Sequence, residues 1–346
     1  MPAAAPHYLV IRRRYLGDIV LLGSVFRNLR LHAPTARITA VIEPAYAGVL
    51  ALNPDVDSVL PLPASFAQWP GFLRKLRAAG ATHVLDFDNT DKTALIARLS
   101  GAAHRSTFNR ELIPFKYGWA YTHTAEVTNH DYDRQHITET YLRLLGAVDV
   151  PVVSREVRLI PRAEDLDHVR KLLPSTLGSR PSTILIHPGS RSSFRLWPAE
   201  RFAAVIDRCQ RELGVSAVLI GSPGETALIE EIRARCTAAP VVVSETLSVP
   251  RLAALMSLFP VLLCHDSGPM HLAASVGARV VALYGSQNAV IWRPLGDQHT
   301  VLQTSLPCSC LPNLPQPCVK SDSYRSYCVR KHEPEDVFAA VAAALK

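Results

Sequence analysis

Short, β-branched apolar runs alternate with longer amphipathic segments along the first half of the chain. Apolar runs span 7–12, 37–43, 56–62 and 82–88, and segments of helical length separate them. The amphipathic stretch 137–148 closes this half. Apolar runs of this length predict strands, and the longer periodic segments predict helices. Their alternation predicts a parallel sheet with helices on both faces.

A polar stretch punctuated by prolines, 149–166, predicts a linker, after which the alternation restarts. Further strands are expected at 182–189, 216–222, 240–244, 260–266 and 278–285, with helices between them. The alanine-rich segment 333–346 predicts a final helix, because acidic residues occupy its first turn. The pattern therefore predicts an α/β protein of two doubly wound domains, 1–160 and 161–346.

Length and composition agree with that expectation. The 346 residues suit two domains of about 150 residues each, and 48% hydrophobic with 19% charged residues predicts a globular chain. Apolar runs stay below the ~20 residues that span a bilayer, and the N-terminal apolar stretch carries arginines and no signal-peptide cleavage site. We therefore expect a cytoplasmic protein.

The net charge of +7 predicts an anionic partner. The sequence has no zinc-finger spacing, no ribonucleoprotein motif and no dense Lys/Arg run, which argues against nucleic acid as that partner. The basic residues are mostly scattered arginines, which favour phosphate-bearing substrates or an anionic membrane surface.

The cysteines fall into two groups. Three stand singly in apolar surroundings and are expected to be ordinary buried thiols: Cys209, Cys236 and Cys264. Four crowd the tail, where metal binding or a structural role is favoured over disulfides in a cytosolic protein: Cys308, Cys310, Cys318 and Cys328. Their spacing is not a standard zinc pattern, so a bound metal is only one alternative beside a structural role.

The stretch HDSGPMH at 265–271 places polar residues between an apolar strand and a helix. Asp266 follows the strand, Ser267 suits the N-cap, and Gly268 lets a ligand approach the backbone. Free amides at the helix start, with the helix dipole, suit a diphosphate, and His271 can add a hydrogen bond. The alternative is a capped helix with an incidental histidine.

Two further loops follow strands of the second half. HPGSRSSFRLWP at 187–198 holds Ser190 and Arg195, and arginine offers fixed, permanently charged donors to phosphate. Glu225 follows another strand in GSPGET and can accept hydrogen bonds from a ribose, or it is only a carboxylate at a helix start. Carboxyl ends of parallel strands share one edge, so we expect these loops to face one ligand site.

In the first half, RRRYLGD follows the first strand. Asp18 is either a helix cap or, opposite a bound nucleotide, a general base. Arg12, Arg13 and Arg14 are candidates for an acidic acceptor, although alternation along a strand points at least one of them elsewhere. The Asp-x-Asp pair at 86–88 has a spacing that recurs elsewhere in the chain and predicts no metal site. The sequence has no GxGxxG, P-loop or GxSxG motif.

Taken together, these segments resemble glycosyltransferase family 9, the heptosyltransferases of the lipopolysaccharide inner core. The matching pieces are YLGDIVLLGSVFRNLR, LIHPGSRSSFRLWP, LLCHDSGPMHLAASVGARVVALYGS and the tail CVRKHEPEDV, in the expected order. The resemblance implies a GT-B fold, with two Rossmann-like doubly wound domains facing across a cleft. It implies that the second domain binds the donor ADP-heptose and the first the acceptor. It also implies an inverting transfer with no metal or cofactor.

Carried over residue by residue, the resemblance makes Asp18 the general base. Ser190 and Arg195 match positions that hold the donor phosphates, although family members often carry Ala or Thr and Lys there. Asp266, Gly268 and His271 match the donor loop, and Glu225 a contact to the nucleoside. The segment 86–92 matches the acceptor-binding segment of the family only loosely. The identity of the acceptor therefore stays open among Kdo, a first heptose, another sugar and protein.

We expect transfer to an anionic lipid-linked oligosaccharide, with peripheral contact to the inner leaflet of the inner membrane through basic residues of the first domain. One alternative is a GT-B sugar-nucleotide epimerase, which requires a second acid/base pair that the sequence does not offer around His271. The other is a non-catalytic sugar-nucleotide or lipopolysaccharide-binding protein, in which Asp18 is dispensable.

Overall fold

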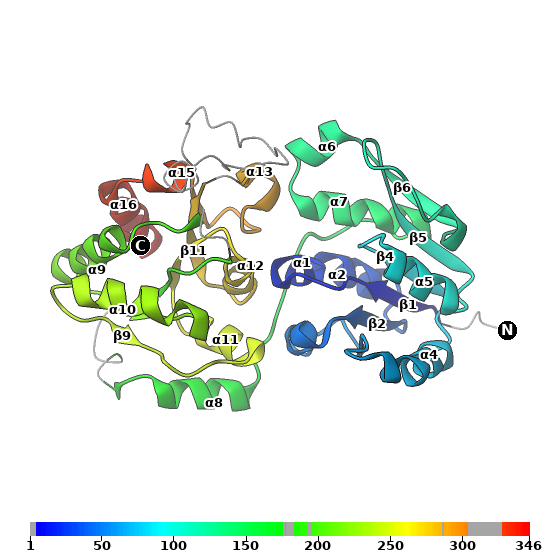
Figure 1. Ribbon diagram of the computed structural model, residues 1–346, viewed down its shortest axis with the longest axis horizontal. Coiled ribbons are helices and arrows are strands. Elements are labelled where there is room, and N and C mark those ends of the chain that lie inside the picture. The colour runs from blue at the N-terminus through cyan, green and yellow to red at the C-terminus, as the bar shows by residue number, and fades with distance from the viewer. Residues whose placement is uncertain (1–4, 176, 178–182, 192–194, 286, 304–326) are drawn as a thin grey trace. The chain divides into compact units, whose positions relative to one another are not determined.

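The computed structural model describes residues 5–175, 177, 183–191, 195–285, 287–303 and 327–346, without the side chains at 327 and 328. The chain divides into two compact units, Met1–Ile160 and Pro161–Lys346. Each unit is built on a six-stranded sheet whose strand pairs are all parallel (Figure 1). The predicted α/β class with two doubly wound sheets is confirmed.

The sheet of the first unit has the order β3-β2-β1-β4-β5-β6. Its strands are β1 (His7–Ile11), β2 (Arg37–Ile42), β3 (Ser58–Pro61), β4 (His83–Asp86), β5 (His104–Arg110) and β6 (His123–Val127). Its helices are α1 (Leu16–Leu21), α2 (Gly23–His32), α3 (Ala47–Leu50), α4 (Trp69–Ala78), α5 (Asp91–Leu99), α6 (Asn129–Arg134) and α7 (Ile137–Arg143). Short 3-10 turns are η1 (Pro44–Tyr46), η2 (Phe66–Gln68), η3 (Gly118–Ala120) and η4 (Leu144–Val148).

The sheet of the second unit has the order β12-β11-β10-β7-β8-β9. Its strands are β7 (Thr183–His187), β8 (Ser216–Leu219), β9 (Val241–Val242), β10 (Val261–His265), β11 (Arg279–Tyr284) and β12 (Thr300–Gln303). The described helices are α8 (Ala163–Leu172), α9 (Ala199–Leu213), the turn η7 (Pro223–Glu225), α10 (Thr226–Arg235), α11 (Val249–Met256), α12 (Gly268–Ser275), α13 (Ala289–Trp292), α15 (Tyr327–Arg330) and α16 (Pro334–Ala344).

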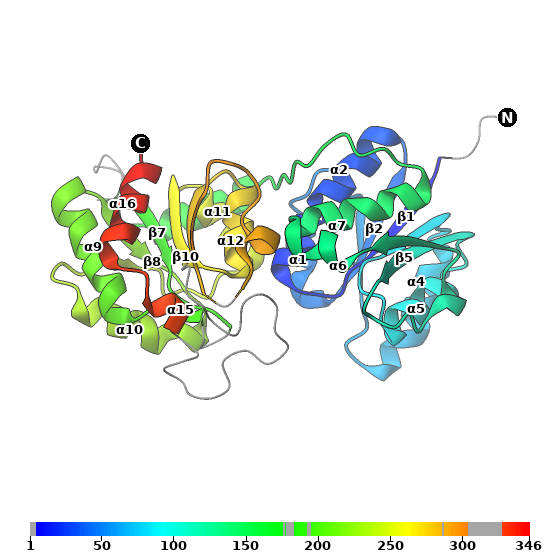
Figure 2. The same ribbon diagram turned by 90° about the horizontal axis from the view of Figure 1, so that it is seen from above.

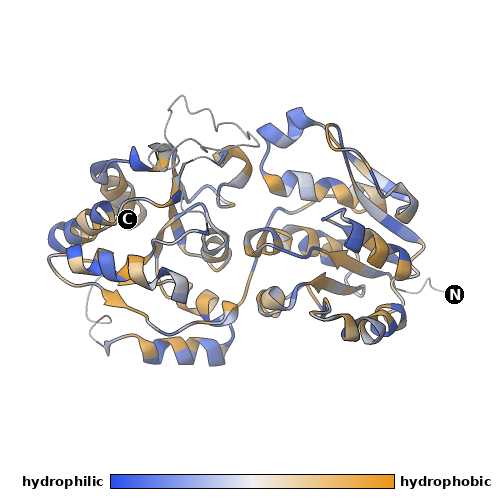
Figure 3. Ribbon diagram, viewed as in Figure 1, coloured by the Kyte–Doolittle hydropathy of each residue, from blue (hydrophilic) through white to orange (hydrophobic). Residues whose placement is uncertain are grey.

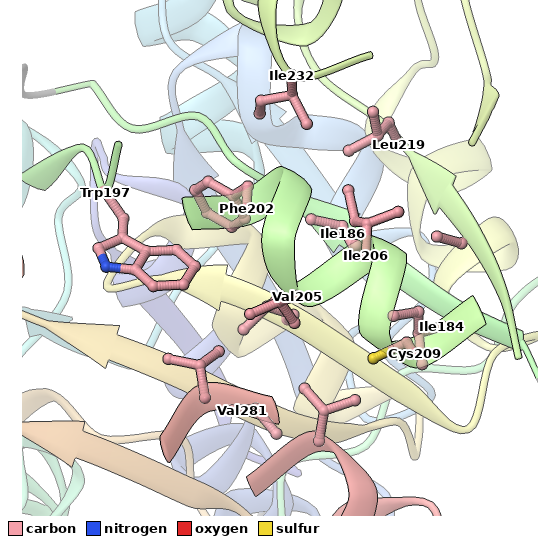
Figure 4. Close-up of a cluster of buried hydrophobic side chains, with 14 of the residues drawn as sticks. Ile184, Ile186, Trp197, Phe202, Val205, Ile206, Cys209, Leu219, Ile232 and Val281 are labelled. Atoms are coloured by element: carbon pink, nitrogen blue, oxygen red, sulfur yellow. The ribbon is translucent and has the colours of Figure 1, made fainter. Parts of the chain in front are cut away.

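Helices cover both faces of each sheet (Figure 2). In the second unit α9, α10 and α16 bury their apolar sides on one face, around Trp197, Phe202 and Ile206 (Figure 4). In the first unit α4 and α5 pack on one face, and α1, α2 and α7 lie on the other. Apolar residues concentrate on the strands and the inner sides of the helices (Figure 3). Burial of this surface is the main force that stabilises each unit.

The expected strands are all present, but β5, β6 and β12 were not predicted. The sequence of β5, HRSTFNR, carries one large apolar side chain, Phe108, so no apolar run marks it. The expected linker is extended from 150 to 162, and Asn28 of α2 holds it through the backbone of Val153 and Ser154. Among the described residues, no helix has the length and apolar character needed to cross a membrane.

Candidate functional site

In each unit, polar side chains gather where the strand order reverses. In the first sheet the chain runs from β1 outward to β2 and β3, and then returns to the other side of β1 as β4. Arg12 follows β1, and Asp88 follows β4, so both lie at the carboxyl edge of this reversal. Ligands of doubly wound sheets bind at this kind of position.

Asp18 lies in the first turn of α1 and is buried. Its Oδ1 accepts hydrogen bonds from Arg12 Nη2 and from the Tyr141 hydroxyl, each at 2.5 Å. Its Oδ2 accepts only a long bond, 3.3 Å, from the Tyr15 amide. Burial raises the pKa of Tyr141 well above its usual value, so the hydroxyl stays protonated and donates. Asp18 thus caps α1 and also keeps one oxygen largely uncommitted.

The three consecutive arginines point in different directions. Arg12 also approaches Asp88 Oδ1 at 3.3 Å, and Arg13 binds Asp88 Oδ2 through both its backbone amide and its Nε. Arg14 is exposed, with its guanidinium 5.4 Å from the ring centre of Tyr15. Two of the three arginines therefore organise carboxylates of this unit, and Arg14 is the one that faces solvent.

Asp86 is a structural carboxyl rather than part of a metal motif. It is fully buried, accepts a 2.6 Å hydrogen bond from the Tyr121 hydroxyl, and also accepts the amides of Asp88 and Asn89. Burial raises the pKa of Asp86 to about 6, although the Tyr121 hydrogen bond opposes the rise. These bonds fix the turn after β4, which positions Asp88 beside the arginines.

Sequence reasoning missed three members of this cluster. Arg110 ends β5 and places its guanidinium 3.8 Å from the ring centre of Tyr132 on α6. Tyr141 comes from α7 and binds Asp18 directly. An arginine at the carboxyl end of a strand is a usable signal, but β5 itself carries no apolar pattern. For the tyrosines the sequence offers no signal beyond their place on amphipathic helices.

In the second unit the reversal lies between β7 and β10, and here the structure brings two predicted residues together. Arg195 Nη1 lies 3.0 Å from Asp266 Oδ2 and also approaches the Asp266 carbonyl at 3.4 Å. Burial raises the pKa of Asp266, and the positive charge of Arg195 opposes that rise. The two quoted loops therefore meet at one edge of the sheet, as expected from the parallel strands.

The donor-loop candidates stand at the start of α12. Ser267 occupies the N-cap in extended conformation, but its side chain makes no capping bond, and its buried hydroxyl has no hydrogen-bond partner. Gly268 begins the helix, and His271 is buried within the first turn. Pro269 carries no amide hydrogen and the Met270 amide donates to the Ser267 carbonyl, so the Gly268 amide and the Ser267 hydroxyl are the groups at this helix start that can bind a ligand.

Glu225 lies against the loop after β7. Its Oε2 accepts bonds from the Ser222 amide at 2.6 Å and hydroxyl at 2.8 Å, and it lies 3.6 Å from Nε2 of His187. The carboxylate fills the space that a Cβ on Gly189 would need, so a larger residue there would displace the Glu225 side chain. Ser190 follows, half-buried. Burial lowers the pKa of His187, although Glu225 opposes this, so a neutral imidazole faces the carboxylate.

A pocket of about 180 Å³ opens beside Glu225. It is formed by residues that follow β7, β8 and β9 and by the first turn of α12, among them His187, Gly221, Val243, Leu247 and Pro269. The walls are mainly apolar and include a few polar groups, among them Ser222, Glu245 and Thr246, a composition typical of small-molecule sites.

The cysteine expectations have a mixed outcome. Cys209 and Cys264 are buried and Cys236 is half-buried, and burial raises the pKa of Cys209 to about 12 and of Cys236 to about 11. In the tail, Cys308, Cys310 and Cys318 lie outside the described residues, and Cys328 belongs to α15 without a described side chain. Within the described part of the chain, no group of three His, Cys, Asp or Glu side chains is placed to hold a metal ion.

Two doubly wound parallel units with polar residues at each strand reversal define the GT-B class of glycosyltransferase fold. The chain belongs to glycosyltransferase family 9 (heptosyltransferase), whose family model matches residues 70–322. Membership of this family makes the chain a transferase.

Individual relatives are distant but cover most of the chain. Lipopolysaccharide heptosyltransferase 3 of Escherichia coli K12 is 25% identical over 299 residues, which cover 81% of this chain and 83% of that protein. A family 9 glycosyltransferase structure from Veillonella parvula superposes with a TM-score of 0.82 at 23% identity, covering 100% of this chain and 98% of the other. The E. coli ADP-heptose LPS heptosyltransferase II structure gives 0.79 at 20% identity, with 98% of each chain covered.

Proposed function

We propose that this transferase moves heptose from ADP-heptose to a sugar of the lipopolysaccharide inner core. The donor and acceptor classes rest on the family and on relatives whose own names carry these substrates. The observation that supports the proposal most directly is the contact between Arg195 and Asp266 beside the unpartnered Ser267 hydroxyl at the start of α12. A charged donor, an unpartnered hydroxyl and the Gly268 amide at one helix start suit a diphosphate.

The second unit is proposed to bind the donor. The pocket beside Glu225 would take the adenine, and the Glu225 carboxylate would accept hydrogen bonds from the ribose hydroxyls. Arg195, Ser190 and the Gly268 amide at the start of α12 would bind the diphosphate, with the Ser267 hydroxyl and His271 as further donors. These charges would stabilise the departing ADP in the way a divalent cation does in other transferases, so the reaction is proposed to need no metal.

The first unit is proposed to supply the base. Asp18 Oδ1 is occupied by Arg12 and Tyr141, so Oδ2 is the oxygen that would take the proton of the acceptor hydroxyl. The deprotonated oxygen attacks the anomeric carbon as the bond to ADP breaks, which inverts the configuration there. Arg12 and Tyr141 hold the carboxylate in one orientation throughout. Exposed Arg14 is the arginine available to an anionic acceptor group.

Because the acceptor would be lipid-linked, we also propose peripheral contact with the cytoplasmic leaflet of the inner membrane through basic residues of the first unit. Electrostatic binding of this kind weakens as salt rises.

The test is ADP release from ADP-heptose with a panel of truncated inner-core acceptors, in the presence of EDTA. Wild type is compared with Asp18→Asn and with Asp167→Asn, a matched change of an exposed carboxylate on α8. We expect acceptor-dependent release by wild type and Asp167→Asn, and almost none by Asp18→Asn. Tight ADP-heptose binding with no release for any acceptor would instead favour a binding protein.

A further inference from the structure

Half of the ten large apolar side chains that the first unit exposes among its described residues lie between residues 66 and 119. Five such side chains stand out, with exposed fractions of 92% for Phe66, 76% for Leu112, 59% for Trp119, 52% for Ile113 and 46% for Leu95. Single exposed apolar residues are ordinary, but a group of this size on one side of a domain marks a surface for a partner.

These residues belong to elements that contact one another on the same side of the sheet. Phe66 lies in η2, which leads into α4, and α4 packs beside α5, which carries Leu95 (Figure 1). Trp119 lies in η3, which contacts α5. Leu112 and Ile113 begin the connection from β5 to η3. We call these elements, η2, α4, α5 and segment 111–119, the outer face of the first unit.

The outer face is also positively charged. Its elements contain six Lys and Arg against two Asp and Glu, which are Arg74, Lys75, Arg77, Lys92, Arg98 and Lys116 against Asp91 and Glu111. Lys116 lies exposed between the apolar residues. Exposed apolar side chains interleaved with cations fit an anionic lipid surface, where both contributions add.

One part of the outer face, Leu112 and Ile113, is connected to the cluster around the candidate base Asp18. Leu112 and Ile113 follow Arg110 by two and three residues, and the Ile113 amide donates to the Arg110 carbonyl. Arg110 lies on the ring of Tyr132. Burial raises the pKa of Tyr132, the charge of Arg110 opposes that rise, and the charge of Asp18 adds to it. A membrane against Leu112 and Ile113 is therefore next to the cluster that holds Asp18.

We propose that the outer face docks on an anionic bilayer, with Phe66, Leu112 and Ile113 entering the interfacial region and lysines and arginines contacting headgroups. This inference rests on the proposed function, because a lipid-linked acceptor requires a bilayer beside Asp18. It goes beyond it by adding an apolar contribution that salt does not remove. A face built only for charge would lose its affinity at high ionic strength.

The test is co-sedimentation with vesicles of 30% phosphatidylglycerol in phosphatidylcholine, at low and at high salt. The variant F66S/L112S/I113S is compared with V153S/V290S, which changes two exposed valines outside the outer face. We expect the triple variant to bind at least about tenfold more weakly at both salt concentrations, and the control to bind like wild type. Lys116→Glu should weaken binding at low salt only. Equal binding by the triple variant and wild type overturns the proposal.

Trp119 supplies a second readout. Its indole emission should shift to shorter wavelength when vesicles are added, and Trp119→Phe should remove most of that shift. Sedimentation velocity of the vesicle-free proteins tests the rival occupant: if the triple variant dissociates an oligomer while its vesicle binding is unchanged, the outer face joins two copies of the chain and the proposal is wrong.

Failure here is distinguishable from failure of the proposed function. With a soluble truncated acceptor, the triple variant should release ADP as fast as wild type, and with acceptor embedded in vesicles it should be slow. If wild type releases no ADP from any acceptor, the transferase proposal is wrong, and vesicle binding still decides the role of the outer face. If the triple variant is slow with both acceptors, the substituted residues act in the site rather than in docking.

Discussion

Arg195 and Asp266 form an ion pair, 3.0 Å between Nη1 and Oδ2, that joins the loop after β7 to the loop after β10. The Asp266 side chain is only 10% exposed and that of Arg195 24%. A carboxylate at this depth is stabilised by its cation, and the cation in turn is held at the start of α12. The ion pair is therefore expected to have two separable roles. It stabilises the second unit, and it presents a guanidinium to the donor.

A double-mutant cycle separates the contribution of the pair to stability from its contribution to donor binding. Arg195→Ala leaves Asp266 buried without its partner and is expected to lower the free energy of unfolding by about 1–3 kcal/mol. Asp266→Asn in the same chain should restore most of that loss, because the neutral amide needs no cation. Donor affinity should stay at least tenfold weaker in both variants. Urea unfolding and calorimetric titration with ADP measure the two quantities, with R170A/D167N as the exposed matched pair. Recovery of ADP binding in the double variant would assign Arg195 a structural role only.

Much of this arrangement could be predicted from the sequence, for a physical reason. Polar loops after apolar parallel strands share the carboxyl edge of a sheet, so the strand pattern predicts that the loops with Arg195 and Asp266 lie at one edge, although it does not predict the ion pair itself. Tyr141 and Arg110 could not be found in the same way. The direction of Tyr141 depends on how α7 packs against α2, and Arg110 ends β5, a strand with too few apolar residues to be recognised.

A second prediction concerns the support of the candidate base. Tyr141→Phe removes one of the two strong donors to Asp18 Oδ1 and leaves Arg12 in place. We expect kcat to fall about tenfold, with little change in KM for ADP-heptose, because the base is less well oriented. Asp18→Asn should lower kcat by about 10²–10⁴. Steady-state ADP release measures both, and Tyr117→Phe on the outer face provides a control. If Tyr141→Phe changes only thermal stability, Tyr141 packs α7 without positioning Asp18.

From the raised pKa of Asp86 we predict how the free energy of unfolding changes with pH. Its pKa is raised to about 6 by burial, so the folded state binds a proton more tightly than the unfolded state does. The free energy of unfolding should therefore fall as pH rises from about 4 to about 6, by an amount on the order of 2–3 kcal/mol. Asp86→Asn should remove that slope from the first unit, because the amide oxygen still accepts the Asp88 and Asn89 amides. Urea unfolding at a series of pH values measures the difference between the two proteins. An identical slope in both would show that Asp86 titrates at the same pH folded and unfolded.

A substitution at Gly189 tests the proposed role of the Glu225 carboxylate in binding the nucleoside. A methyl group at residue 189 would occupy the position of that carboxylate, so Gly189→Ala must displace Glu225 from Ser222. We expect weaker ADP binding, by about tenfold or more, together with lower stability. The double variant G189A/E225A should regain stability because the collision is gone, while ADP binding stays weak because the proposed ribose acceptor is gone too. Gly146→Ala is the matched control, since an added Cβ there meets open space. Recovery of ADP binding in G189A/E225A would mean that Glu225 caps α10 and does not contact the nucleoside.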